Sequence, residues 1–137
     1  MFKKVGCLIF SLTALMILWG IYRKPVFGGY ADKFEAYRGF YSSQAQITQT
    51  DYIGYAFILD GTGEAVTLEK GTDAQEIMRD FGATEVFSET VDGGTCRYCY
   101  SPRLKNEKIV DGKRVNLQIY DGEKYVKVGT PLIFGGY

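Results

Sequence analysis

Residues 115–128, VNLQIYDGEKYVKV, have the pattern of two β-strands joined by a tight turn. Val115, Leu117 and Ile119 alternate with polar or amphipathic side chains, as a strand with one buried face requires. The Asp-Gly pair at 121–122 separates the two segments, and both residue types tolerate the positive φ of tight hairpin turns. We therefore expect antiparallel strands on either side of this pair.

Three further Asp-Gly pairs, at 60–61, 92–93 and 111–112, divide the chain in the same way. The segments beside each pair have the composition of strands, which favours hairpins at all four places. In chain order, the expected strands lie at 52–59, 64–69, 84–91, 95–101, 108–110, 114–120 and 123–128.

One segment, GTDAQEIMRDFGA at 71–83, has a helical period instead. Thr72 and Gln75 match the capping box S/T-x-x-E/Q, and Gly82 stands where a left-handed residue closes a helix. The apolar side chains recur at i, i+3, i+4 and i+7, which gives one apolar stripe: Ala74, Ile77, Met78 and Phe81. The order of elements predicts an α+β fold, a curved antiparallel sheet with one main helix packed across it.

Residues 1–24 have the character of a membrane anchor or a signal segment. An uncharged run of eighteen residues from Val5 to Tyr22 lies between two pairs of basic residues. As a helix this run is roughly 27 Å long, close to the roughly 30 Å hydrocarbon core of a bilayer. Charge and Pro25 follow the run where a signal peptide has a small-residue cleavage site, so we favour an uncleaved anchor.

The early position of the anchor favours a cytoplasmic N-terminus, with the rest of the protein outside the cell membrane. Residues 25–51 are interpreted as a juxtamembrane linker with a short helix from Asp32 to Arg38. Residues 52–137 then form the α+β domain.

The distribution of charge argues against nucleic acid as a partner. All sixteen acidic residues follow the anchor, together with twelve of the sixteen basic ones, so the part outside the membrane has a net charge of −4. Phosphate backbones are bound by clustered Lys and Arg instead. The chain also has no His, which removes the commonest general base and metal ligand.

The Cys-x-x-Cys at 96–99 raises the question of metal or redox chemistry. Successive side chains of the expected strand point to opposite faces of the sheet, so Cys96 shares a face with Tyr98 and Cys99 lies with Arg97. Metal binding or a disulfide requires a turn that brings both sulfurs together. We favour simple packing and keep redox use of Cys96 and Cys99, a disulfide and a metal site as alternatives.

The segment PRLKNEKIVDGKR at 102–114 holds five basic residues against two acids. It suits contact with anionic headgroups or cell-wall polymers, and it equally fits a solvated loop whose lysines discourage strand addition. The candidate interaction surface consists of Tyr98, Tyr100, Arg103, Lys105, Lys108 and Arg114.

Catalysis is not supported by any motif. Carboxylates are not paired in a spacing that singles them out for acid/base work, and the glycines at 61 and 63 do not precede a helix, as a phosphate loop requires. We expect no enzyme activity and no cofactor.

The C-terminal segments VNLQI at 115–119 and VGTPLI at 128–133, with the terminal Tyr137, resemble the C-terminal signature of the YwmB family. The fold of these bacterial proteins is similar to that of the TATA-box-binding protein. The segments RDFGA at 79–83 and YSPRL at 100–104 occur in the order of that family's second repeat, so the resemblance extends over the α+β domain.

This resemblance implies an envelope protein of spore-forming, Gram-positive-type bacteria without an established activity. Family members have two related halves, whereas this chain has room for one after its anchor, which suggests a homodimer. We therefore expect a non-enzymatic, membrane-anchored, extracytoplasmic binding or structural module whose partner is an envelope protein or polymer. The alternatives are a thiol redox protein using Cys96 and Cys99, and a DNA binder like the TATA-box-binding protein.

Overall fold

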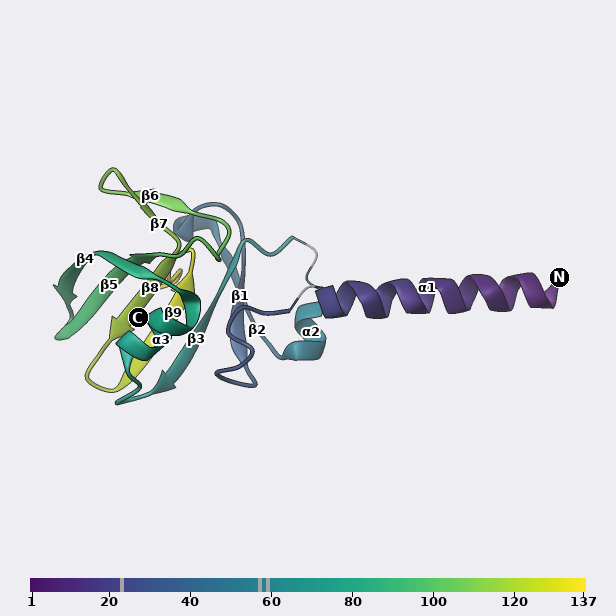
Figure 1. Cartoon of the computed structure of the whole chain (residues 1–137), viewed down its shortest axis with the longest axis horizontal. Helices are drawn as coiled ribbons and strands as arrows, with labels where there is room; N and C mark the ends of the chain where they lie inside the picture. Colours follow the sequence, from purple (N-terminus) through teal and green to yellow (C-terminus); the bar gives the residue numbers. More distant parts are fainter. Residues whose placement is uncertain (23, 57, 59) are drawn as a thin grey trace.

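The computed structural model describes residues 1–22, 24–56, 58 and 60–137, and it confirms the α+β class (Figure 1). The helices are α1 (Phe2–Tyr22), the 3-10 helix η1 (Ser42–Gln44), α2 (Tyr52–Ala56) and α3 (Ala74–Phe81). The strands are β1 (Phe34–Arg38), β2 (Gln46–Thr50), β3 (Gly63–Glu69), β4 (Thr84–Val91), β5 (Gly94–Tyr100), β6 (Lys108–Val110), β7 (Lys113–Val115), β8 (Leu117–Asp121) and β9 (Tyr125–Thr130).

Seven strands form one sheet in the order β2-β1-β3-β9-β8-β5-β4, and each neighbouring pair is antiparallel. The hairpin β6–β7 is a separate two-stranded sheet that projects from the main one (Figure 1). The last strand of the chain, β9, lies between β3 and β8 at the centre of the sheet.

Both faces are covered over the central strands of the sheet, whereas the side chains of the outer strands β2 and β4 are exposed or half-buried. On one face, the buried side chains of α3 pack against Leu117, Ile119 and Val128. On the other face, Ile133 of the C-terminal segment 131–137 packs with Cys96, Tyr98 and Tyr120. The prediction of one buried face for β8 is therefore wrong, because the chain after β9 folds back across the sheet.

Two hydrogen bonds from backbone amides to buried side chains hold the C-terminal segment in place. The amide of Ile133 donates to the Gln118 side-chain oxygen at 2.8 Å, and the amide of Phe134 donates to the Tyr37 hydroxyl at 3.2 Å. The Phe134 ring also stacks on Tyr37, with centroids 4.8 Å apart. Buried polar side chains thus serve as attachment points for the segment that closes the second face.

Three of the four expected hairpins are confirmed. At 92–93 and 111–112 the Asp and Gly adopt positive φ values of 48° and 76°, and of 50° and 74°, and join β4 to β5 and β6 to β7. The third hairpin joins β8 to β9, but Asp121 still pairs with Val126 in the ladder. Its turn therefore begins after Asp121.

The hairpin expected at 60–61 is wrong. Residues 52–56 form α2, not a strand, because the Asp51 carboxylate accepts a hydrogen bond from the Gly54 amide at 2.8 Å and so starts a helical turn. The rest of the expected strand includes Phe57 and Leu59, which lie outside the described residues. Strand β3 pairs instead with β1 and β9.

The short helix expected from Asp32 to Arg38 is also wrong, since Phe34–Arg38 is the strand β1. Residues 34–50, which we assigned to the linker, supply both β1 and β2 to the main sheet. Phe34 and Tyr37 are buried, so the aromatic side chains of this segment pack on the domain. Burial of side chains on both faces of β1 outweighs local helix preference here.

The helix predicted within 71–83 is confirmed, but its cap differs. The Asp73 carboxylate accepts from the Gln75 amide at 2.9 Å and is the N-cap, while the Thr72 hydroxyl donates to the Glu69 carbonyl. The predicted Thr72–Gln75 capping box is therefore wrong by one position. Gly82 closes the helix in the left-handed conformation, at φ 59°.

Candidate functional site

The two cysteines of the Cys-x-x-Cys motif lie on opposite faces of β5, as predicted. Cys96 packs with Tyr98, Tyr120 and Ile133 beneath the C-terminal segment, whereas Cys99 belongs to the core under α3. Within the described residues both thiols are free and fully buried. An intact strand separates the sulfurs, so they have no route to a mutual disulfide.

The surroundings of each thiol are those of a packed side chain. The Gln118 amide donates a hydrogen bond to the Cys96 sulfur at 3.0 Å. Burial, with a smaller contribution from the nearby Glu85 carboxylate, raises the pKa of Cys99 to about 12. Cys99 is therefore protonated near neutral pH, which removes the nucleophilic thiolate. No cluster of three or more Cys, Asp or Glu side chains within the described part of the chain is arranged to hold a metal ion.

The prediction that Tyr98 belongs to the interaction surface is wrong. Only 9% of this residue is exposed, and its ring stacks on Phe87 with centroids 4.4 Å apart. The Tyr98 hydroxyl donates to the Glu89 carboxylate at 2.7 Å. Burial raises the pKa of Tyr98, so the hydroxyl stays a neutral donor. Strand alternation places this side chain on the same covered face as Cys96.

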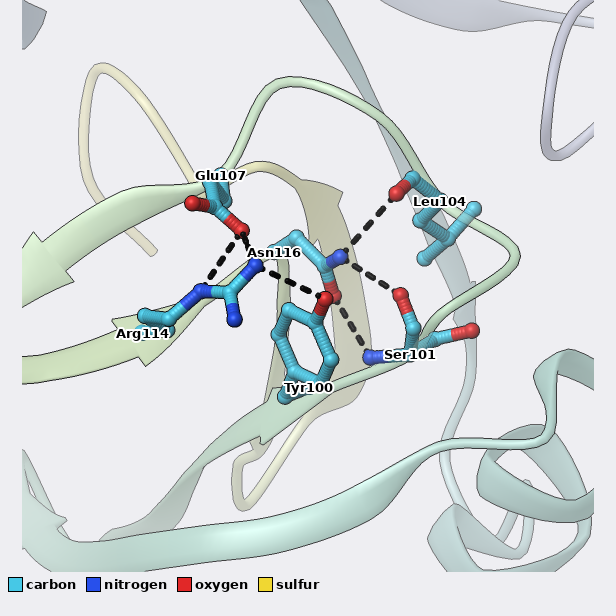
Figure 2. A network of polar contacts seen from close by, with 6 residues as sticks. All are labelled: Tyr100, Ser101, Leu104, Glu107, Arg114 and Asn116. Carbon is cyan, nitrogen blue, oxygen red and sulfur yellow. Dashed lines mark hydrogen bonds and ion pairs between the residues drawn. The ribbon is translucent and has the colours of Figure 1, made fainter.

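Tyr100 and Arg114 do meet, together with Glu107 (Figure 2). Arg114 donates to the Glu107 carboxylate at 2.6 and 2.9 Å, and to the Tyr100 hydroxyl at 3.1 Å. Its guanidinium carbon also lies 4.9 Å from the centre of the Tyr100 ring. The three side chains hold the hairpin β6–β7 against the end of β5.

Asn116 fixes the loop behind this cluster (Figure 2). Its buried side chain accepts from the Ser101 amide at 2.7 Å and donates to the carbonyls of Ser101, at 2.7 Å, and Leu104, at 3.2 Å. The hydrogen bonds of the Asn116 side-chain amide thus fix the start of the loop that carries the basic residues. We did not single out Asn116 from the sequence, because a polar residue at an alternating strand position fits a solvent-facing side chain.

Lys108 joins the hairpin to two exposed aromatic rings, Phe40 and Tyr41, which are not part of the predicted interaction surface. The Lys108 ammonium donates to the Phe40 carbonyl at 2.7 Å and lies 5.9 Å from the ring centres of both Phe40 and Tyr41. These two residues are 72% and 69% exposed. In the sequence, the only indication that Phe40 and Tyr41 are exposed is that they follow a Gly in a segment rich in aromatic residues.

A shallow hollow lies next to these rings. Its volume is about 180 Å³, and its lining includes Thr62, Asn106, Glu107, Lys108 and Phe134. Arg103 lies apart from the hollow, donating to the Asp80 carbonyl near the end of α3 at 3.3 Å, and Lys105 is exposed on the connecting loop. We define the hairpin surface as Tyr100, Lys105, Lys108, Arg114, Phe40 and Tyr41.

Two carboxylates serve the fold, the half-buried Glu35 and the buried Glu64. Glu35 pairs with Lys127 at 3.2 Å, and the same ammonium donates to the Gly136 carbonyl at 3.1 Å. Glu64 is fully buried and accepts a hydrogen bond from the Phe27 amide at 2.7 Å. Burial raises the pKa of Glu64, whereas that amide favours its charged form. These groups tie the C-terminal segment and the residues after α1 to the sheet.

The helix α1 extends away from the folded domain (Figure 1). Its residues Phe2–Trp19 have a mean hydropathy of 1.6, and none of this stretch is buried. It is long and apolar enough to cross a membrane by length and composition. No protein-family model, curated protein or solved structure matches this chain.

Proposed function

We propose that this protein is a non-enzymatic binding module of a bacterial cell envelope, anchored by α1 with its domain on the extracytoplasmic side. The observation that carries the proposal is the contrast between the two parts of the chain. The domain covers both faces of the central strands of its sheet, whereas α1 leaves a predominantly apolar stretch of eighteen residues, Phe2–Trp19, unburied. Such a helix is stable in lipid, whereas in water its exposed apolar surface favours aggregation.

The hairpin surface is the proposed contact region for an envelope protein or polymer. It combines exposed aromatic rings with basic side chains, a composition that suits protein and polymer contacts. Its loop is held from below by Asn116, so the contact groups are presented in a fixed arrangement.

The two alternative functions have less support. A thiol redox role needs Cys96 and Cys99 to approach each other, and they lie on opposite faces of a paired strand. DNA binding on a sheet needs a free, basic sheet face. Here both faces of the central strands are covered, and the part of the chain after the anchor carries a net charge of −4.

Cysteine labelling in bacterial cells tests the topology. In a Cys7→Ser background, Lys105→Cys adds one exposed thiol to two buried ones. We expect a membrane-impermeant maleimide to label Lys105→Cys in intact cells after the wall is removed. The matched variant Lys3→Cys should react only after permeabilisation, and the Cys7→Ser background should not react. Labelling of Lys105→Cys only in permeabilised cells would place the domain in the cytoplasm, and loss of the protein from alkali-washed membranes would refute the anchor.

Binding itself is tested by sedimentation of the full chain, kept in detergent, with purified cell-wall fragments. We expect the full chain to sediment with these fragments, and the double variant Phe40→Ala/Tyr41→Ala to lose that binding. The exposed Ile47→Ala serves as a control outside the hairpin surface. Equal binding by both variants would remove the hairpin surface from the proposal.

A further inference from the structure

The short helix α2 lies beside the domain-proximal end of α1 and contacts it (Figure 1). It exposes apolar surface at this place, because Ile53 is 74% exposed and Tyr52 is also exposed. Ile109 is exposed on β6, and the hairpin β6–β7 lies away from α2 and α1 (Figure 1). The domain therefore has an exposed apolar surface on α2 that is continuous with the apolar helix α1.

The position of α2 along α1 sets its depth relative to a bilayer. If Phe2–Trp19 crosses the hydrocarbon core, the end of α1 that follows Trp19 reaches the headgroup level. A segment packed beside this end of α1 lies at the same level. Tyrosine and large aliphatic side chains are favoured there, because a ring or alkyl group enters the acyl boundary while polar atoms stay hydrated.

The helix α2 is rigidly connected to the domain, so its contact would orient the whole sheet. The Tyr52 hydroxyl donates to the Gly28 carbonyl, in the segment that follows α1. The Phe34 ring of β1 packs edge-on against Tyr52 and Tyr55, with centroids 6.1 and 5.4 Å apart. These contacts fix α2 relative to β1 and to the segment that follows α1, so a contact between α2 and a membrane would also fix the orientation of the sheet.

Charge beside α2 is mixed and does not favour an electrostatic contact. Lys33 and Asp51 line the same hollow, of about 320 Å³, and Lys24 is exposed after the end of α1. An acidic and a basic group side by side largely cancel for an anionic surface. The apolar side chains therefore carry the interaction.

We infer that α2 is a membrane-docking helix: Ile53 enters the acyl boundary of the bilayer that α1 crosses, Tyr52 lies at headgroup level, and the domain stands on the membrane in one orientation. This inference rests on the proposed anchoring by α1. The occupant of the exposed face of α2 is the lipid interface itself.

Fluorescence quenching by brominated lipid tests the inference on the full chain in phosphatidylcholine vesicles. Trp19 is the single Trp of the sequence, so Trp19→Phe gives a background without indole. In that background we expect Ile53→Trp to lose most of its emission when the acyl chains are brominated. Ile109→Trp, which is 65% exposed at the far hairpin, should keep its emission. Adding anionic phosphatidylglycerol should change neither result.

The outcomes separate the docking from the anchor. Quenching of Trp19 in the wild-type chain, without quenching of Ile53→Trp, would keep the anchor and overturn the docking helix. Equal quenching of Ile53→Trp and Ile109→Trp would also overturn it, because the contact would not be specific to α2. Absence of Trp19 quenching would overturn the anchor and the docking helix together.

Discussion

At the scale of single residues, Glu64 gives the clearest dependence on pH. Burial raises its pKa above the ordinary value of 4.5, so the folded state holds this proton more tightly than the unfolded state does. The corresponding stability is fully present below the unfolded pKa and is lost as pH rises through the folded pKa. Deprotonation at higher pH leaves a buried charge with a hydrogen bond from the Phe27 amide.

Glu64→Gln should remove this pH dependence, because an amide oxygen can still accept from Phe27 but cannot ionise. We expect the free energy of unfolding of the variant to rise relative to the wild type as pH increases from 4.5 towards the raised pKa. Urea unfolding of both proteins in detergent, across that pH range, gives the difference. A constant difference would show that Glu64 has an unshifted pKa, and the exposed Glu76→Gln is the control.

At the scale of elements, the C-terminal segment is predicted to be a main source of stability. Phe134 is buried and stacks on Tyr37, so Phe134→Ala should cost about 3–5 kcal/mol of unfolding free energy. The matched control Phe40→Ala removes the same side chain from an exposed position and should change stability by no more than about 0.5 kcal/mol. Urea unfolding measures both, and equal effects would mean that the segment does not close a core.

The elements that could be predicted from sequence are those decided by neighbouring residues. The turns at 92–93 and 111–112 need only an Asp-Gly pair and short flanking strands, and α3 needs only its apolar stripe and Gly82. Strand β1 could not be predicted in this way, since it depends on pairing with β3 across the intervening α2. The covered second face depends similarly on Ile133 meeting Gln118.

In the candidate site, too, the features that depend on neighbouring residues could be predicted, and those that depend on distant contacts could not. Opposite orientation of Cys96 and Cys99 follows from strand alternation and was predictable. The burial of Tyr98 was not, because it requires the C-terminal segment and a stacked Phe87. Phe40 and Tyr41 meet Lys108 across a long separation in sequence, so composition alone did not join them to the basic segment.

At the scale of the whole molecule, a second copy of the chain could pair with an edge of the sheet more readily than it could pack on a face of the central strands. Strand β2 is an outer strand with an exposed, uncharged sequence, QITQT, whereas the other edge strand, β4, carries Glu85, Glu89 and a register shift. Charges and irregular pairing discourage strand addition. If the homodimer implied by the YwmB resemblance forms, we propose that it pairs β2 with β2.

Light scattering of the full chain in detergent tests this dimer, with the detergent mass subtracted. We expect a dimer mass that falls to the monomer mass when Thr48→Lys places a charge on the exposed edge strand, because charges there discourage strand addition. Thr90→Lys, on the opposite edge strand, is the matched control and should leave the mass unchanged. A monomer mass for the wild-type chain would refute the dimer.

The central position of β9 also determines when the domain can form during biosynthesis. Strand β9 joins β3 to β8 in the sheet. Neither half of the sheet can be completed until β9 has left the ribosome. The apolar helix α1 is synthesised before all of these strands. A membrane-inserted chain would therefore pass its strands across the bilayer before they can fold, which is the state that a narrow translocation channel requires.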